Sequence, residues 1–439
     1  SAGFFYSRYA APGEGDAYKE ANYFHKLYYH RLGTPQADDL LMYERPDQKE
    51  WNFSGVVSKD GHYLIIYATH GTFRQNGIFY KELTHPDSPV VPLLTGFDAE
   101  YHFVGNDGPH FYFKTDHSAP LGRLIAIDIR ESAVMAWQEL IAEGADVLHN
   151  VSFVNRQFIA NYLRDAHSHV QIYDQEGALL RSVDLPGIGT VSGFGGDPEA
   201  RETFYSFTSF TTPGIIYRYD LDRGESTVFR QPTLHFDPDL YVTTQIFYPS
   251  KDGTQVPMFL CHQKGLEINA QTPTYLYGYG GFNIPLTPSF AVNVLTWMEM
   301  GGIYAQPNLR GGGEYGKTWY QAGTLEQKQH VFDDFIAAAE WLIANGYTST
   351  PKLAIAGGSN GGLLVGACMT QRPDLFGACL PAVGVLDMLR YHKFTIGWAW
   401  VSDYGSPDDP EQFKTLLSYS PYHNVKPGVH YPPTLITTG

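Results

Sequence analysis

The feature that most restricts the fold is a repeat in the first half of the chain. Four segments share one pattern, in which an aromatic residue leads a strand, a polar hairpin follows, and a second strand completes the unit. The leading residues are Tyr63, Phe111, Phe158 and Phe204, which follow one another at steps of 48, 47 and 46 residues. A period in the forties with about four short strands per unit is typical of β-propeller blades, and a β-sandwich with chance regularity is the alternative.

An earlier unit is indicated by "GFFYSRYA" (3–10) and "HKLYYHRL" (25–32), with an inserted loop around Pro12–Ala21. Residues 1–232 are therefore predicted to form part of a propeller with about five blades visible. Because propellers close with roughly four to eight blades, either the ring has five blades or further blades lie upstream of residue 1. The total number of blades is left open.

The pattern changes in residues 233–439, where strands alternate with helices. Apolar side chains recur at three- and four-residue steps over 331–346, which predicts a helix. Asp333 and Asp334 fall in its first turn, where the helix dipole favours negative charge. Short apolar strands are predicted at "KLAIA", "GACLPAVGV" and "PPTLITTG". This alternation indicates a parallel sheet covered by helices, so we expect an α/β domain after the propeller.

Composition argues against several classes of partner. The net charge of −16 disfavours binding to phosphate backbones, so no nucleic-acid partner is expected. No apolar run reaches the ~18 residues of a membrane span, so no membrane partner is expected either. The cysteines, Cys261, Cys368 and Cys379, form no C-x-x-C pair, which fits a reducing compartment. The 17 histidines show no metal-ligand spacing, and no metal site is predicted.

One short motif raises the question of nucleotide binding. The stretch "RGGGEYGKTW" (310–319) matches the phosphate-binding pattern G-x-x-x-x-G-K-[ST]. Its setting disfavours that function, because the preceding residues are polar and include Pro307, and the next clear helix begins only near Val331. We therefore predict that the glycines serve close backbone packing, and that the protein uses no cofactor.

A second motif carries chemistry. "GGSNG" (357–361) matches G-x-S-x-G and lies between the apolar strand "KLAIA" and the helical pattern "LLVGACM". In that setting the motif predicts a nucleophile elbow, a tight turn that presents a serine hydroxyl beside helix N-terminal amides. Ser359 is the predicted nucleophile, and an ordinary Gly-Ser turn is the alternative.

With these residues in view, the chain resembles the prolyl oligopeptidase (prolyl endopeptidase) family of serine peptidases. The resemblance covers essentially the whole chain, more loosely in the propeller. It is carried by "YGYGGFN" (277–283), "NLRGGGEYGKTWY" (308–320), "GGSNGGLL" (357–364) and "GVLDMLRYHKFTIGWAWVSDYGSP" (384–407). It implies a propeller capping an α/β-hydrolase domain, and an endopeptidase that cuts short peptides on the carboxyl side of proline through an acyl-enzyme intermediate.

The resemblance also implies a site. Ser359 is the nucleophile, and the oxyanion hole uses the backbone N–H of Asn360 and the hydroxyl of Tyr279. A phenol suits this role because its hydrogen bond strengthens as negative charge develops. Trp400 is implied to stack on the substrate proline ring, whereas Trp398 stands where the family commonly has histidine. The other implied walls of the pocket are Phe282, Val385 and Tyr404.

The triad partners are expected elsewhere. In α/β-hydrolases the order is Ser, acid, His, and the family's acid comes just after the strand that "PTLITTG" resembles. The acid, a substrate-binding arginine and the histidine are therefore expected after Gly439. None of the downstream histidines sits at the family's position; they are His392, His423 and His430. The chain is thus expected to be an internal fragment that lacks both ends.

The remaining expectations concern the state of the protein. A monomer in the cytoplasm is expected, with the periplasm and secretion left open because the true N-terminus is expected upstream. Two other functions stay open at this point. One is a non-catalytic scaffold that binds partners, and the other is an esterase or other acyl hydrolase on the same fold.

Overall fold

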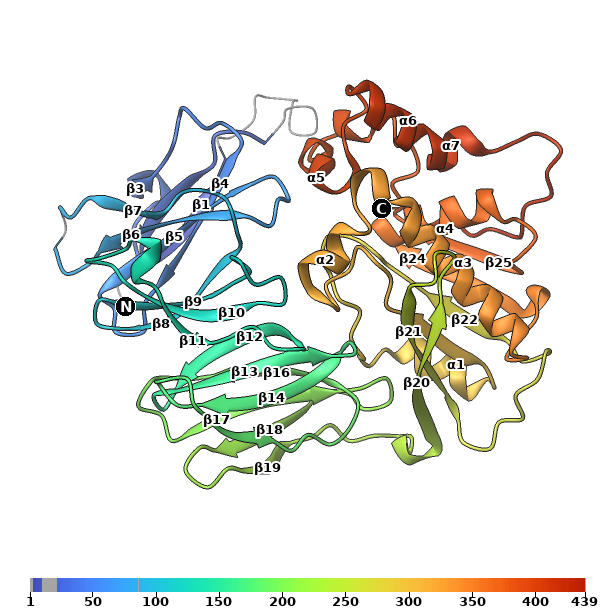
Figure 1. Ribbon diagram of the computed structural model, residues 1–439, viewed down its shortest axis with the longest axis horizontal. Coiled ribbons are helices and arrows are strands. Elements are labelled where there is room, and N and C mark those ends of the chain that lie inside the picture. Colours follow the sequence, from blue (N-terminus) through green and yellow to red (C-terminus); the bar gives the residue numbers. More distant parts are fainter. Residues whose placement is uncertain (1–2, 10–21, 86, 439) are drawn as a thin grey trace.

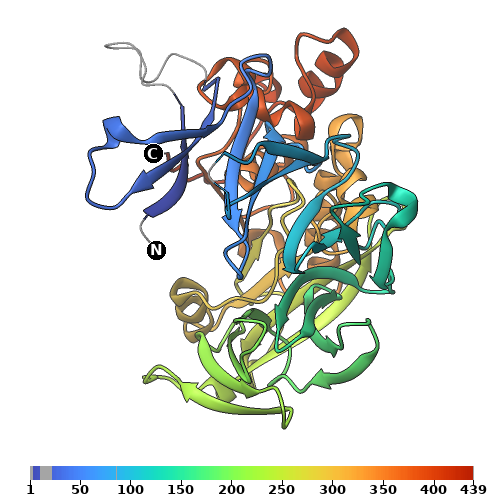
Figure 2. The ribbon, with the colours of Figure 1, turned by 90° about the vertical axis from the view of Figure 1, so that its left-hand side faces the viewer.

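The computed structural model describes residues 3–9, 22–85 and 87–438. Its first half contains five antiparallel sheets, here called blades one to five, in which neighbouring strands follow chain order. Figures 1 and 2 show them arranged as an arc from blue to green, each beside the next. The loop expected around Pro12–Ala21 lies almost wholly outside the described residues.

The blades are built as follows. Blade one contains β1 (Gly3–Arg8), β2 (Lys26–Arg31) and β3 (Leu40–Tyr43), and blade two contains β4 (Trp51–Val57), β5 (Tyr63–His70), β6 (Asn76–Glu82) and β7 (Val90–Leu94). Blade three contains β8 (Tyr101–Asp107), β9 (His110–Thr115), β10 (Arg123–Asp128) and β11 (Gln138–Ile141), and blade four contains β12 (Val147–Val154), β13 (Gln157–Arg164), β14 (His167–Tyr173) and β15 (Leu179–Val183). Blade five contains β16 (Thr190–Gly195), β17 (Glu202–Thr208), β18 (Ile215–Asp220) and β19 (Glu225–Arg230).

The core of this half lies in the seams between neighbouring blades. Phe111 is fully buried against residues of blade two such as Ile78, and Phe158 is fully buried against Tyr112 of blade three. Flat aromatic rings suit these seams because they fill the space between two pleated faces with a large apolar area. Phe204 differs, since its side chain is 38% exposed. The propeller architecture that the repeat predicted is confirmed.

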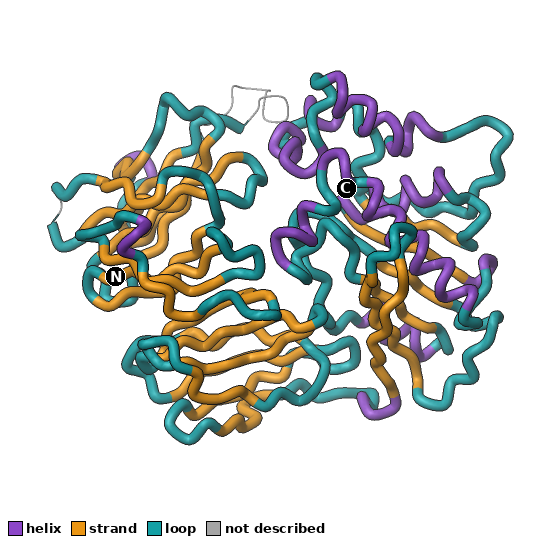
Figure 3. Tube along the Cα trace, viewed as in Figure 1, coloured by secondary structure: helices purple, strands orange, loops and turns teal. Residues whose placement is uncertain are grey.

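The second half is built on one mixed sheet, covered by helices as Figure 3 shows. The strand order is β20-β21-β23-β22-β24-β25, and the last four pair in parallel. The strands are β20 (Tyr241–Pro249), β21 (Gln255–Gln263), β22 (Thr274–Tyr277), β23 (Ile303–Pro307), β24 (Leu353–Gly358) and β25 (Ala378–Ala382). The helices are α1 (Val292–Glu299), α2 (Gly316–Gln321), α3 (Gln329–Ala344), α4 (Asn360–Gln371), α5 (Val401–Tyr404), α6 (Pro410–Tyr419) and α7 (Pro421–Asn424).

Alternation along the strands divides the two faces of this sheet. In β21, Met258 and Leu260 belong to the cluster that contains α3 and α4, whereas Phe259 packs with α1 and with Phe210 of the propeller half. Successive side chains of a strand point to opposite faces, so one strand serves both layers. The "PPTLITTG" segment extends the sheet, because Thr434 bridges in parallel to β25. Among the described residues, no helix is long and apolar enough to span a membrane.

Two local expectations were wrong. A six-residue helix, α2, begins at Gly316, so helix resumes well before Val331. The helix predicted over 331–346 runs over Gln329–Ala344, and Asp334 lies a turn inside it. Asp334 is fully buried and paired with the guanidinium of Arg310 at 2.6 Å, so an ion pair rather than the helix dipole explains this acid.

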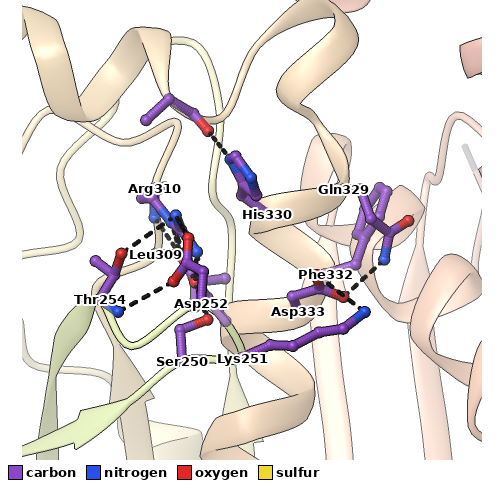
Figure 4. A network of polar contacts seen from close by, with 12 residues as sticks. Ser250, Lys251, Asp252, Thr254, Leu309, Arg310, Gln329, His330, Phe332 and Asp333 are labelled. Atoms are coloured by element: carbon purple, nitrogen blue, oxygen red, sulfur yellow. Dashed lines mark hydrogen bonds and ion pairs between the residues drawn. The ribbon is translucent and has the colours of Figure 1, made fainter.

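That ion pair is the centre of a polar network (Figure 4). Arg310 also pairs with Asp252 at 2.5 Å, and the Ser250 hydroxyl donates to Asp334 at 2.5 Å. The backbone N–H of Arg310 donates to the same carboxylate at 3.1 Å. The network therefore joins the β20–β21 turn, the loop that carries the glycine run, and α3.

We predict that Asp334→Ala lowers the free energy of unfolding of this half by about 3–5 kcal/mol, because it leaves a buried guanidinium without its partner. Urea unfolding followed by tryptophan fluorescence measures the change. Lys251→Ala is the control, since Lys251 is 77% exposed and its ion pair with Asp333 is expected to contribute at most about 1 kcal/mol. Equal shifts for the two variants would contradict the role given to the network.

Candidate active site

Ser359 occupies a strained turn between β24 and α4. Its backbone has φ 56° and ψ −116°, outside the regions that non-glycine residues ordinarily occupy. A Cβ on Gly357 would come within 2.4 Å of the Gly361 carbonyl oxygen, and one on Gly362 within 2.6 Å of the Gly384 Cα. The glycines are therefore required by close backbone approach, and the turn has the geometry of a nucleophile elbow.

Two hydrogen-bond donors lie beside the Ser359 hydroxyl. Asn360 is the first residue of α4, so its backbone N–H has no acceptor within the helix. Tyr279 follows β22, and its side chain lines the same cavity as Ser359. Burial raises the pKa of the Tyr279 hydroxyl, and the nearby Ser359 hydroxyl only partly opposes that shift. Tyr279 therefore keeps its proton at neutral pH and can donate to a developing oxyanion.

The Asn360 side chain has a structural role that the sequence did not predict. Its amide donates to the Tyr279 carbonyl oxygen at 2.6 Å and accepts a hydrogen bond from the Tyr404 hydroxyl at 3.0 Å. Asn360 is buried, and these bonds fix the oxyanion tyrosine and a wall of the pocket relative to the nucleophile. The only signal in the sequence is the asparagine next to the serine. Its backbone N–H is predicted to belong to the oxyanion hole, and the sequence indicates no role for its side chain.

The predicted site residues come together around one cavity of about 510 Å³. All of them except the buried Asn360 line it, that is Tyr279, Phe282, Ser359, Val385, Trp400 and Tyr404. Phe282 and Tyr404 pack edge to face at 5.4 Å between ring centroids, and Trp400 stacks on Tyr391 at 6.4 Å with an interplanar angle of 12°. A pocket with these aromatic walls suits a compact apolar ring.

The structure separates the two nearby tryptophans. Trp398 is not among the residues that line the cavity, and its ring lies 5.7 Å from that of Tyr23 in the propeller half. Trp400 lines the cavity, although the two residues share a segment and a residue type. The difference arises because the short 3₁₀ helix Gly397–Trp400 directs them to different surroundings.

The propeller half supplies the opposite wall, which sequence reasoning did not identify. Arg74 and His102 line the cavity and both contact the Glu100 carboxylate, His102 at 2.6 Å. Burial would raise the pKa of Glu100, but the hydrogen bond from His102 and the charge of Arg74 lower it to about 2. Nearby, the Thr72 hydroxyl donates to the Ala399 carbonyl oxygen at 2.7 Å, which ties blade two to the pocket segment.

This cavity leads toward a second one of about 380 Å³ between the two halves. The cavities share four lining residues, Tyr67, Arg74, Glu100 and His102. The second cavity is also lined by Lys114 and by Lys317 of α2. The cavity that holds Ser359 therefore adjoins a polar space between the two halves.

The downstream histidines lie away from the nucleophile. His392 is 3.4 Å from the Asp408 carboxylate, and His423 contacts the Ser420 hydroxyl at 2.8 Å. Neither of them, nor His430, lines the cavity that holds Ser359. Within the described ranges, no group of three His, Cys, Asp or Glu side chains could hold a metal ion. The triad acid and histidine expected after Gly439 stay a prediction.

Part of the glycine loop already bonds within the protein. The Gly311 N–H donates to the Trp319 carbonyl at 3.0 Å, the Gly312 N–H to the Leu309 carbonyl at 3.2 Å, and the Gly316 N–H to the Gly313 carbonyl at 3.2 Å. The Lys317 side chain pairs with Asp116 of blade three at 3.2 Å, and the backbone N–H of Lys317 donates to the Pro120 carbonyl. The loop packs the hydrolase half against the propeller half.

We therefore expect the parent protein and Lys317→Ala to bind no ATP or GTP in calorimetry at millimolar nucleotide, because three of the loop amides and the lysine already have partners. The Lys317→Ala variant separates specific binding from background. Saturable binding by the parent that the variant loses would contradict this prediction.

Comparisons with known proteins agree with this architecture. Residues 1–232 match the family model described as "Prolyl oligopeptidase, N-terminal beta-propeller domain", and residues 288–439 match "Prolyl oligopeptidase family". A prolyl endopeptidase of Elizabethkingia miricola is 46% identical over 99% of this chain and 62% of its own length. Prolyl oligopeptidase A of Amanita bisporigera is 38% identical over 100% of this chain and 59% of its own length.

Solved structures give the same result. A chain from a structural study of two prolyl endopeptidases superimposes with a TM-score of 0.93 at 42% identity, covering 99% of this chain and 64% of that one. Prolyl oligopeptidase B of Galerina marginata, bound to a 25mer macrocyclization substrate, gives 0.95 at 34% identity, covering 100% and 62%. The chain spans about three-fifths of the length of the relatives it matches. With its propeller, its hydrolase sheet and its serine elbow, the chain belongs to the prolyl oligopeptidase family.

Proposed function

We propose that the protein is a serine endopeptidase that hydrolyses short peptides on the carboxyl side of proline through an acyl-enzyme intermediate. The observation that carries the proposal is the cavity in which the elbow serine, a tyrosine hydroxyl donor and an aromatic pocket meet. The names of the relatives, prolyl endopeptidase and prolyl oligopeptidase, support it.

The geometry gives each group a step in the reaction. The Ser359 hydroxyl attacks the carbonyl carbon of the proline residue while an imidazole takes its proton. The resulting oxyanion accepts hydrogen bonds from the Asn360 N–H and the Tyr279 hydroxyl. When it collapses, the imidazolium gives its proton to the departing amine, the C–N bond breaks, and an ester is left on Ser359. Water then attacks that ester by the same route. A serine hydroxyl without an adjacent base is a weak nucleophile, so the proposal requires that imidazole.

The aromatic pocket is proposed to select proline. Trp400 offers a flat face to the pyrrolidine ring, and Phe282, Val385 and Tyr404 close the sides. None of these four side chains carries a charge, so the pocket has no ionic partner for a basic or acidic side chain. The polar space between the halves is proposed to hold the rest of a short peptide.

We further propose that the protein acts as a cytoplasmic monomer on short proline-containing peptides, without a nucleic-acid or membrane partner. The net charge of −16 and the pI of about 5.4 support the part that concerns nucleic acid, because such a surface repels phosphate backbones.

Ser359→Ala in the intact protein is expected to lower kcat for a prolyl-amide reporter by ~10⁴–10⁶ while leaving the melting temperature unchanged. Ser418→Ala, at an exposed position, is the control and should retain full activity. A fluorophosphonate should label the parent and not Ser359→Ala. Absence of labelling in the parent would favour a non-catalytic scaffold, and turnover of esters without turnover of prolyl amides would favour an esterase.

Trp400→Ala is expected to lower kcat/KM for substrates with proline before the cut about 2- to 10-fold more than for matched substrates with alanine. That ratio corresponds to the ~0.5–1.5 kcal/mol that an aromatic stack adds beyond its burial. Trp398→Ala is the matched control, because Trp398 lies outside the cavity and should leave the proline-to-alanine preference unchanged. Equal losses on both substrates in Trp400→Ala would assign Trp400 to the core alone.

A further inference from the structure

A buried ion pair lies directly behind the cavity. The Lys328 ammonium is 3.3 Å from the Asp403 carboxylate, and the two side chains are 1% and 0% exposed. Lys328 immediately precedes α3, and Asp403 lies in α5 between two walls of the pocket, Trp400 and Tyr404. A buried ion pair is weak evidence for stability by itself, since desolvation offsets most of the attraction. Its contacts therefore indicate what it does.

The further contacts of the pair converge on one loop. The Lys328 ammonium donates to the Gly280 carbonyl oxygen at 3.0 Å. The other carboxylate oxygen of Asp403 accepts the Phe282 backbone N–H at 2.9 Å. The carboxylate of Asp403 therefore has two donors, the Lys328 ammonium and the Phe282 N–H, one on each oxygen. The pair thus holds the backbone at two points. One is Gly280, directly after the proposed oxyanion donor Tyr279, and the other is Phe282, which forms a wall of the pocket.

The loop held by this pair, residues 279–283, has a strained backbone. Phe282 and Asn283 both have φ 56°, in the left-handed region that non-glycine residues rarely occupy. Gly280 has φ 64°, and a Cβ there would lie 2.3 Å from the Val331 side chain. Residues held in such a shape persist only where their surroundings enforce it, and here two of the enforcing bonds come from the buried pair.

We propose that Lys328 and Asp403 form a positioning pair, which holds residues 279–283 so that the Tyr279 hydroxyl meets the oxyanion and Phe282 closes the proline pocket. This inference rests on the proposed peptidase function and deepens it, since neither residue touches the substrate. The pair also links three segments that lie far apart in sequence, the 279–283 loop, the residue that precedes α3, and α5.

The test measures kcat per active site in the intact protein, with active sites counted by fluorophosphonate titration. Asp403→Asn and Lys328→Met are each expected to lower this kcat by about 10- to 100-fold on both prolyl and alanyl substrates, because a misplacement of about 1 Å can cost that much. A purely structural role would lower the number of titrated sites and the melting temperature but leave kcat per site unchanged.

A double-mutant cycle tests whether the pair acts through the Tyr279 hydroxyl. In a Tyr279→Phe background the oxyanion hydroxyl is already absent, so Asp403→Asn should lower kcat per site by less than about threefold there. If either single variant is too unstable to titrate, the double variant Lys328→Met/Asp403→Asn, which leaves no buried charge, replaces it. An unchanged kcat per site, or an equal fall in both backgrounds, would overturn the proposal.

Matched controls use the ion pair between Lys251, which is 77% exposed, and Asp333 of α3. Lys251→Met and Asp333→Asn make the same chemical changes outside the cavity, and each should leave kcat per site unchanged. If the parent fails to cleave after proline, the proposed specificity fails, yet the positioning pair is still tested by the rate at which Ser359 reacts with the fluorophosphonate. A normal rate in Asp403→Asn, or no reaction of Ser359 in the parent, would refute the inference.

Discussion

The backbone of Ser359, held at φ 56° where β24 meets α4, is the constraint around which the hydrolase half is arranged. Such a turn persists only if neighbouring backbones approach closely, which is why glycine stands at positions 357, 361 and 362. The same approach brings the end of β22 beside the elbow. Tyr279 thus lines the same cavity as Ser359 as a consequence of sheet order, since β22 and β24 are neighbouring parallel strands.

The site belongs to both halves of the chain. The hydrolase half provides the nucleophile and the aromatic pocket, whereas blades two and three provide the Arg74, Glu100 and His102 cluster that faces them. The halves are joined near the site by the Thr72 hydroxyl bond to Ala399 and by the Lys317–Asp116 ion pair. The glycine loop that resembles a phosphate cradle therefore helps to join the two halves beside this cavity.

Two buried ion pairs stabilise the irregular segments of the hydrolase half. Arg310–Asp334 fixes the glycine loop to α3 and to the β20–β21 turn, and Lys328–Asp403 fixes the 279–283 loop to α5. Loops carry backbone N–H and C=O groups that no sheet or helix satisfies, so buried loops need such partners. Both pairs involve residues at or near the start of α3, which makes that helix a common support for the loops around the cavity.

The amino-acid sequence was enough to predict the architecture and a candidate nucleophile. The repeat of forty-six to forty-eight residues predicted blades, and G-x-S-x-G between a strand and a helix predicted the elbow, because both signals are local patterns of spacing and residue type. The oxyanion and pocket residues came from the family resemblance, and nearly all of them line one cavity. Only the tertiary structure showed that Trp400 and not Trp398 lines that cavity, that Asp334 pairs with Arg310, and that blades two and three complete the site. Those facts depend on contacts between segments far apart in the chain, and such contacts are set by how the elements pack, which no local pattern records.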